Sequence, residues 1–120
     1  MSKHLQSDLD RLQREMLSLA STVEERICTA VRALQCRDAA LAQRVVAGDD
    51  EIDQHEIKIE DECLKVIALH QPVAVDLRRI AASMKINSDL ERMADLAVDI
   101  AERAIRLSEL GTIEIPAKLQ

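Results

Sequence analysis

Aromatic residues are absent from this sequence, and its 120 residues include only two Gly and two Pro. Without Phe, Tyr or Trp, the chain has none of the side chains on which proteins usually stack nucleic-acid bases. Its core must therefore be built from Leu, Ile, Val, Ala and Met. This composition favours helices, because small and straight-chain side chains lose little rotamer freedom in them.

A positive charge balance and long apolar runs are also missing. The formal net charge of −6 argues against nucleic acid as a partner, because phosphate contacts draw their affinity from Lys and Arg. No apolar run approaches the roughly 20 residues that span a bilayer, and Met1 to Asp10 does not have the pattern of a signal peptide. We therefore expect one cytoplasmic domain that is at most peripheral to a membrane.

The three cysteines, Cys28, Cys36 and Cys63, form no CxxC pair. Cys28 and Cys36 are eight residues apart on one predicted helix, which is too far for a disulfide between them. We therefore interpret all three as small core residues in a reducing compartment.

Hydrophobic periodicity predicts a long first helix. Its apolar residues follow one another at steps of three and four, which is typical of a one-sided bundle helix. The stripe consists of Leu5, Leu9, Leu12, Met16, Leu19, Val23, Ile27, Ala30 and Leu34. Arg37-Asp38 interrupts the pattern, and Asp38 is a plausible N-cap for the next helix.

A second helix is predicted from Leu41 to about His70, with a kink or break at Gly48. A third is predicted to begin at Pro72, a residue suited to a first turn, and to stop at Gly111. Asp76 would then lie favourably near the positive end of the helix dipole. Three long helices with short connections predict an all-α, antiparallel three-helix bundle.

The third predicted helix carries two apolar stripes. The first runs through Leu77, Ile80, Met84, Val98 and Ile105, and we expect it to pack on the other helices. The second contains Ile86, Leu90, Met93, Ala97, Ile100, Ala104 and Leu107. Because the second would be left uncovered, we interpret it as an interface for self-association or for a partner.

Acidic residues recur at helical spacing on the second and third predicted helices. Asp49, Asp53, Glu56 and Glu60 lie beside the apolar stripe of the second predicted helix, and spacing alone favours a solvated flank. That stripe consists of Leu41, Val45, Ile52, Ile59, Cys63 and Val66. Extending the Leu77 stripe instead reaches Asn87 and Glu91, with Asp95 one turn later. Carboxylates on an apolar-facing line are costly to desolvate unless they are paired. For Glu91 and Asp95, metal binding and ion pairing with neighbouring Lys and Arg both remain open.

Motifs of the common enzyme classes are missing from the sequence. It has no Ser-His-Asp order, no Gly-rich phosphate loop and no Glu-x-x-His pairs of ferritin-like di-iron bundles. His55 and Lys58 have the His-x-x-Lys order of phosphotransfer bundles, but Ile59 and Glu60 stand where small residues are usual. We therefore predict a non-catalytic protein and regard this match as coincidental.

Three motifs, in the right order and at the right spacing, resemble the phosphate-uptake regulator (PhoU) family. Gly48-Asp49-Asp50-Glu51-Ile52-Asp53 is similar to the start of a repeat's second helix, and Gln71-Pro72-Val73-Ala74-Val75-Asp76-Leu77-Arg78 resembles the inter-helix signature. Leu90-Glu91-Arg92-Met93-Ala94-Asp95 resembles the third-helix motif, with Met93-Ala94 in place of the more usual Ile-Gly. The likeness covers roughly residues 5 to 110.

This resemblance implies a negative regulator of phosphate uptake and of phosphate-starvation signalling. Such a protein would contact subunits of a phosphate ABC transporter and a sensor histidine kinase. The resemblance also implies iron or zinc binding through Glu/Asp-x-x-x-Asp motifs, which are matched by Asp49/Asp53 and by Glu91/Asp95. Asp95/Asp99 has the same form, but we do not assign it to the site.

The family usually has two tandem three-helix repeats, whereas this sequence contains one, over residues 1–111. Residues 112–120 resemble the opening of a further helix. The sequence is therefore either part of a longer protein or a single-repeat homologue, which we expect to be a homodimer. Three alternatives from other classes are a carboxylate-rich metal-binding or metal-storage bundle, a histidine phosphotransfer module and a plain structural oligomer.

Overall fold

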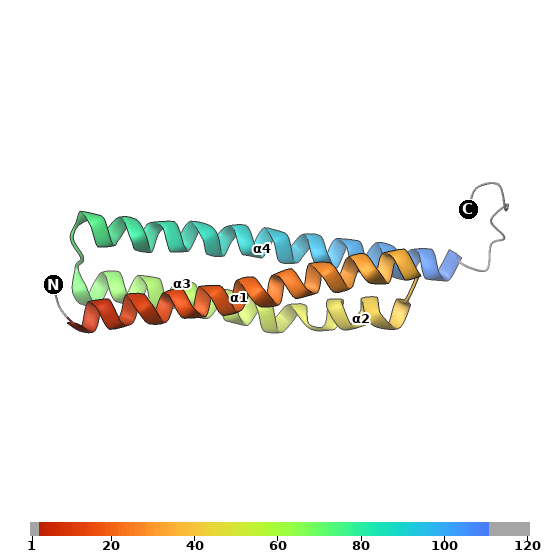
Figure 1. Ribbon diagram of the computed structural model, residues 1–120, viewed down its shortest axis with the longest axis horizontal. Coiled ribbons are helices and arrows are strands. Elements are labelled where there is room, and N and C mark those ends of the chain that lie inside the picture. Colours follow the sequence, from red (N-terminus) through yellow and green to blue (C-terminus); the bar gives the residue numbers. More distant parts are fainter. Residues whose placement is uncertain (1–2, 111–120) are drawn as a thin grey trace.

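Four helical segments make up the part of the chain that the structure describes, residues 3–110. In this computed structural model they are α1 (Lys3–Cys36), α2 (Ala39–Ala47), α3 (Asp49–His70) and α4 (Ala74–Glu109). Figure 1 shows α2 and α3 following one another along one leg of the bundle, beside the long helices α1 and α4. The predicted all-α, three-legged antiparallel bundle is therefore confirmed, and the predicted second helix is broken at Gly48.

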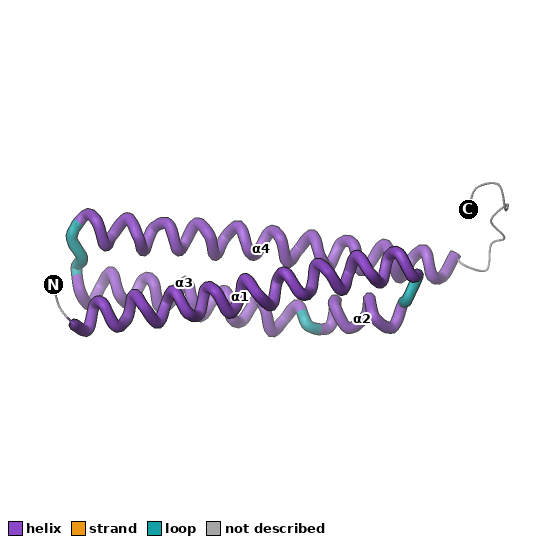
Figure 2. Tube along the Cα trace, in the orientation of Figure 1, coloured by secondary structure: helices purple, strands orange, loops and turns teal. Residues whose placement is uncertain are grey.

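The connections are short, as the teal segments of Figure 2 show. Arg37 ends α1 with a positive φ of 52°. Asp38 caps α2, because its Oδ1 accepts a hydrogen bond from the backbone N–H of Leu41 at 3.0 Å. The N-cap predicted from the sequence is therefore confirmed, and it satisfies one of the donors that a helix start leaves without a partner.

The predicted start of the last helix at Pro72 is wrong by two residues. Gln71 adopts a left-handed conformation (φ 43°) that ends α3, and Val73 is extended and serves as the N-cap of α4. Pro72 therefore lies in the connection, and Asp76 lies in the first turn of α4, where it is buried. Gly111, the predicted end of this helix, and the predicted tail 112–120 lie outside the described residues.

The core changes character along the bundle. Where α1 packs with α3 and the first part of α4, the buried residues are large: Leu5, Leu9, Leu12, Met16, Leu19, Val23, Ile52, Ile59, Cys63, Val66, Ile80, Leu90 and Ala94. Where α1 packs with α2 and the rest of α4, most are alanines: Ala30, Ala33, Ala42, Val45, Ala97, Ala101 and Ala104. Small side chains allow the helix backbones to approach closely at that end of the molecule.

The two predicted stripes of α4 do not separate into a packed face and a free face. Leu77 of the first stripe is exposed, whereas Ile80 is buried. From the second stripe, Leu90, Ala97 and Ala104 are buried, and only Ile86, Met93 and Leu107 are exposed. The prediction of a wholly uncovered second stripe is therefore wrong. The physical reason is that α4 packs against α1, α2 and α3 together, so its buried face is wider than one stripe.

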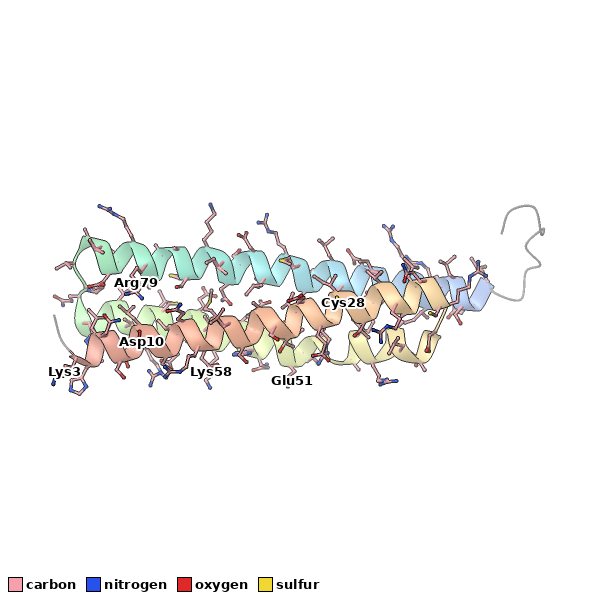
Figure 3. All side chains as sticks on the ribbon, viewed as in Figure 1. Lys3, Asp10, Cys28, Glu51, Lys58 and Arg79 are labelled. Atoms are coloured by element: carbon pink, nitrogen blue, oxygen red, sulfur yellow. The ribbon has the colours of Figure 1, made fainter. Side chains whose placement is uncertain are left out.

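The cysteine prediction holds for one residue of three. Cys63 is buried in the core, but Cys28 and Cys36 are exposed on α1, where Cys28 is labelled in Figure 3. The α1 stripe already supplies the buried positions at steps of three and four, and both of these cysteines fall outside it. None of the helices between residues 3 and 110 is long and apolar enough to cross a bilayer.

Candidate functional site: an acidic groove between α3 and α4

A groove of about 520 Å³ lies between α3 and α4, and most of its polar lining is acidic. From α3 it receives Asp53, Glu56 and Glu60, and from α4 it receives Asn87, Glu91 and Asp95. Asp and Glu spaced three or four residues apart lie on one side of a helix, so each helix presents a row of oxygen atoms. The antiparallel packing of the two helices brings the rows together. Lys and Arg are absent from the lining.

Glu56 is the most unusual member of the groove, because it is charged by nature but only 6% exposed. Burial, followed by the nearby carboxylates of Glu91, Asp53, Asp95 and Asp49, raises the pKa of Glu56 to about 8. Both effects penalise the ionised form. At neutral pH, Glu56 is therefore mostly protonated and contributes little negative charge to the groove.

Asn87 holds the two helices in register beside Glu56. Its Nδ2 donates a hydrogen bond to the backbone carbonyl of Glu56 at 2.9 Å. Two other buried oxygen atoms of this pair, Asn87 Oδ1 and Glu56 Oε1, have no hydrogen-bond partner among the described residues. Unpartnered buried oxygens are costly, so these two can be satisfied by the proton of Glu56, by a water molecule or by a bound cation.

Asp49 lies at the start of α3, half-buried, with one further unpartnered oxygen, Oδ1. Burial raises its pKa, and the carboxylates of Asp53, Asp95 and Asp50 add to the rise, while Arg26 opposes it. The influence of Asp95 shows that the bundle brings Asp49 near a carboxylate of α4, 46 positions further along the sequence.

The four residues predicted to bind metal therefore come together only in part. Asp53, Glu91 and Asp95 line the groove, and Asp49 approaches it. Glu91 and Asp95 are exposed, so the burial expected from the apolar stripe is wrong. The ion-pair alternative is not realised either, because between residues 3 and 110 no Lys, Arg or His lies within 4.0 Å of either carboxylate; Arg92 pairs with Asp89 instead.

Two further residues of the groove were not selected as candidates from the sequence. Spacing favoured a solvated flank for Glu56, and this interpretation is wrong because the residue is buried against α4. Asn87 was reached only as an extension of the Leu77 stripe. The sequence did contain a signal for Asn87, because it is a polar residue at a position where the Leu77 stripe would otherwise continue with an apolar one.

The chemistry of the donor set can be compared with that of metal sites. Carboxylate and amide oxygens suit hard cations and iron, whereas structural zinc sites usually include Cys or His. Within residues 3–110, no group of three His, Cys, Asp or Glu side chains is already placed around one point. The donor atoms fit an oxygen-bound cation, and such an ion would have to draw the side chains together.

His55 is not among the residues that line the acidic groove. Its Nε2 lies 2.7 Å from Glu15 Oε2, so it is engaged with a carboxylate of α1. A phosphoryl group on that nitrogen would lie against the negative charge of Glu15 and would be repelled by it. The contact gives no support to the phosphotransfer alternative.

Comparisons with known proteins agree on one family. The family model described as "PhoU domain" matches residues 16–104. A relative from Aquifex aeolicus, named phosphate-specific transport system accessory protein PhoU homolog, is 47% identical over 102 residues, which cover 85% of this chain and 46% of the relative. A homolog of the same name from Pseudomonas aeruginosa is 40% identical over 111 residues, covering 92% of this chain and 46% of its own length.

The solved structures give the same result for the fold. The crystal structure of PhoU from Pseudomonas aeruginosa superimposes with a TM-score of 0.86 at 40% sequence identity, covering 88% of this chain and 51% of that chain. The chain thus spans about half the length of the curated relatives and of the solved structure that it matches.

Proposed function

The chain belongs to the PhoU family, and from this premise we propose that it acts in the negative regulation of phosphate uptake and phosphate-starvation signalling. The observation that carries the proposal is the match of nearly the whole bundle to PhoU at 40% identity. The relatives are named as accessory proteins of phosphate-specific transport. We propose that the chain works in the cytoplasm as a non-catalytic regulator, through contacts with subunits of a phosphate ABC transporter and with a sensor histidine kinase.

Exposed apolar side chains at the α3–α4 connection support a contact mechanism. Leu69, Val73, Val75 and Leu77 all lie there and are exposed. Such a concentration of apolar surface at one end of a bundle is typical of an interaction site. We propose this end as the surface that meets the transporter or the kinase.

An affinity capture tests this function. Tagged chain, expressed in phosphate-replete cells, is expected to retain the phosphate transporter ATPase or the sensor kinase, identified by mass spectrometry. The Val73→Asp/Val75→Asp variant is expected to lose this partner by at least about tenfold, because charge is introduced into an apolar contact. Leu96→Asp, at an exposed apolar position elsewhere on α4, should retain it. Capture of neither protein by the wild-type chain would contradict the proposal.

A second apolar surface supports the proposed homodimer. A groove of about 390 Å³ between α1 and α4 contains Met16, Leu17 and Ile86; Leu17 is 63% exposed and Ile86 50%. The relatives and the solved structure that this chain matches are about twice as long as the matched part. Two copies of this chain would together have about that length. We therefore propose a second copy as the occupant of this groove.

Sedimentation equilibrium tests the dimer. The wild-type chain is expected to be dimeric at micromolar concentration, and Leu17→Glu/Ile86→Glu is expected to weaken association by at least about a hundredfold, because two buried apolar contacts become charged. Leu64→Glu/Leu69→Glu makes the same change at exposed positions of α3 and should leave the association constant unchanged. A monomeric wild-type chain at high micromolar concentration would rule out the dimer.

We further propose that the acidic groove binds iron or zinc through Asp49, Asp53, Glu91 and Asp95. Glu56 and Asn87 would supply additional oxygen atoms, since each already has one without a partner. The oxygen-rich donor set favours iron over zinc. A bound cation would neutralise the repulsion between the rows of α3 and α4 and so stabilise the bundle, which is a structural role. A separate metal-storage function has no further observation in its favour.

A further inference from the structure

Three arginines line a groove between α1 and α2. Arg26 and Arg32 come from α1 and Arg44 from α2, and they line a space of about 590 Å³ that also contains Thr29 and Val45. Glu25 is the one acidic residue in this lining. In a chain with a net charge of −6, this is a local excess of positive charge.

None of the three guanidinium groups has a carboxylate partner. Among the described residues, the ion pairs within 4.0 Å involve Arg11, His55, Lys65, His70 and Arg92, but not these three. Asp49 attracts Arg26 without pairing with it. Three guanidinium groups without a carboxylate partner along one groove attract anions from solution.

The end of the Arg26 side chain packs directly against Gly48. A Cβ atom at residue 48 would lie 1.6 Å from Arg26 Nη1 and 2.6 Å from Arg26 Cζ, so the guanidinium lies directly against the Cα of Gly48. Any larger residue at this position would have to push the end of the Arg26 side chain aside. Gly48 is also the point at which the second leg breaks into α2 and α3.

We propose that this groove is a binding site for a small, multiply charged oxyanion of the phosphate class, held by Arg26, Arg32 and Arg44. The planar guanidinium fork donates two parallel hydrogen bonds to such an anion. Two helices contribute the donors, so they can approach the anion from different sides. The same chemistry is offered by free phosphate or pyrophosphate and by a phosphoryl group on a peptide. The lining of this groove shares no residue with that of the acidic groove, although Asp49 follows Gly48 directly in the chain. The proposal does not depend on the function proposed above.

Titration calorimetry in a low-salt, phosphate-free buffer tests the site. The chain, freed of metal by a chelator and dialysed, is titrated with sodium pyrophosphate, sodium phosphate and a phosphoserine peptide. We expect saturable binding of at least one of them, and the tightest identifies the source of the phosphate group. Arg32→Ala/Arg44→Ala is expected to lower its affinity by at least about tenfold. Arg14→Ala/Arg78→Ala removes two exposed arginines outside the groove and should have little effect.

Gly48→Ala provides a test that changes no charge. Residue 48 has right-handed helical backbone angles (φ −81°, ψ −4°), so Ala fits the backbone, and its methyl group must displace Arg26. We expect a severalfold loss of affinity with an unchanged circular dichroism spectrum. Equal affinity in wild type, Arg32→Ala/Arg44→Ala and the control pair would reduce the effect to general charge attraction and would overturn the proposal. So would the absence of binding by all three probes.

Discussion

Fe²⁺, added without oxygen to the chelator-treated chain, is expected to raise its melting temperature by roughly 10 °C at an ion concentration about 100 times the Kd. Binding to the folded state alone produces this shift, since the unfolded chain does not assemble the oxygen rows of α3 and α4. Glu91→Gln/Asp95→Asn removes the two carboxylates that α4 contributes to the groove and is expected to abolish most of the shift. Differential scanning calorimetry measures both.

Matched variants separate a site from general charge attraction. Glu102→Gln/Glu109→Gln neutralises two exposed carboxylates of α4 outside the groove and should retain the full shift. Zn²⁺ is expected to give a smaller shift than Fe²⁺, because the groove offers oxygen atoms and no Cys or His. Equal shifts in both double variants would rule out the groove as the binding site.

The first helix illustrates what local sequence could predict. Leu5, Leu9, Leu12, Met16, Leu19 and Val23 follow a single period, and all of them are buried in the structure. The helix packs along one side, so its period and its buried face coincide. The same reasoning placed Asp38 at a helix start, because capping depends on residues three positions apart.

The last helix shows where this reasoning stopped. It contacts all three other helices, so which side of α4 is covered depends on the neighbour at each level. Leu77 is on the expected packing stripe and is exposed, whereas Leu90 is on the other stripe and is buried. Periodicity gives the faces of a helix, but the partners of each face are a long-range property of the bundle.

The acidic groove was predictable in its parts but not in its register. The spacing of Asp49 and Asp53, and of Glu91 and Asp95, indicated one row of carboxylates on each helix. Which residues of α3 face which residues of α4 depends on the turn at Gln71, Pro72 and Val73 and on the packing of both helices against α1. Only the assembled bundle places Asn87 against the backbone of Glu56 and buries that carboxyl group.

Because Glu56 is buried, we expect the Glu56→Gln substitution to change how the stability of the metal-free chain depends on pH. The folded chain holds the Glu56 proton up to about pH 8, whereas an exposed glutamate releases it near the ordinary value of 4.5. Between these values the folded state binds more protons than the unfolded state, so the stability of the wild-type chain falls as pH rises. Gln, which cannot ionise, avoids this loss. The stability advantage of Glu56→Gln over wild type is expected to grow by up to about 1.4 kcal/mol for each pH unit between about pH 5 and pH 8.

Urea denaturation at several pH values measures the effect, with Glu60→Gln as the control one helical turn later. Glu60 lines the same groove but is exposed, so its replacement relieves some repulsion without removing a buried charge. The stability difference between Glu56→Gln and wild type should be small near pH 5 and grow steadily towards pH 8, while Glu60→Gln should keep the wild-type slope. A difference that does not change with pH would mean that Glu56 ionises normally in the folded chain. In that case Glu56 would carry no extra proton at neutral pH. The unpartnered oxygens of Glu56 and Asn87 would then have to be hydrogen-bonded to water.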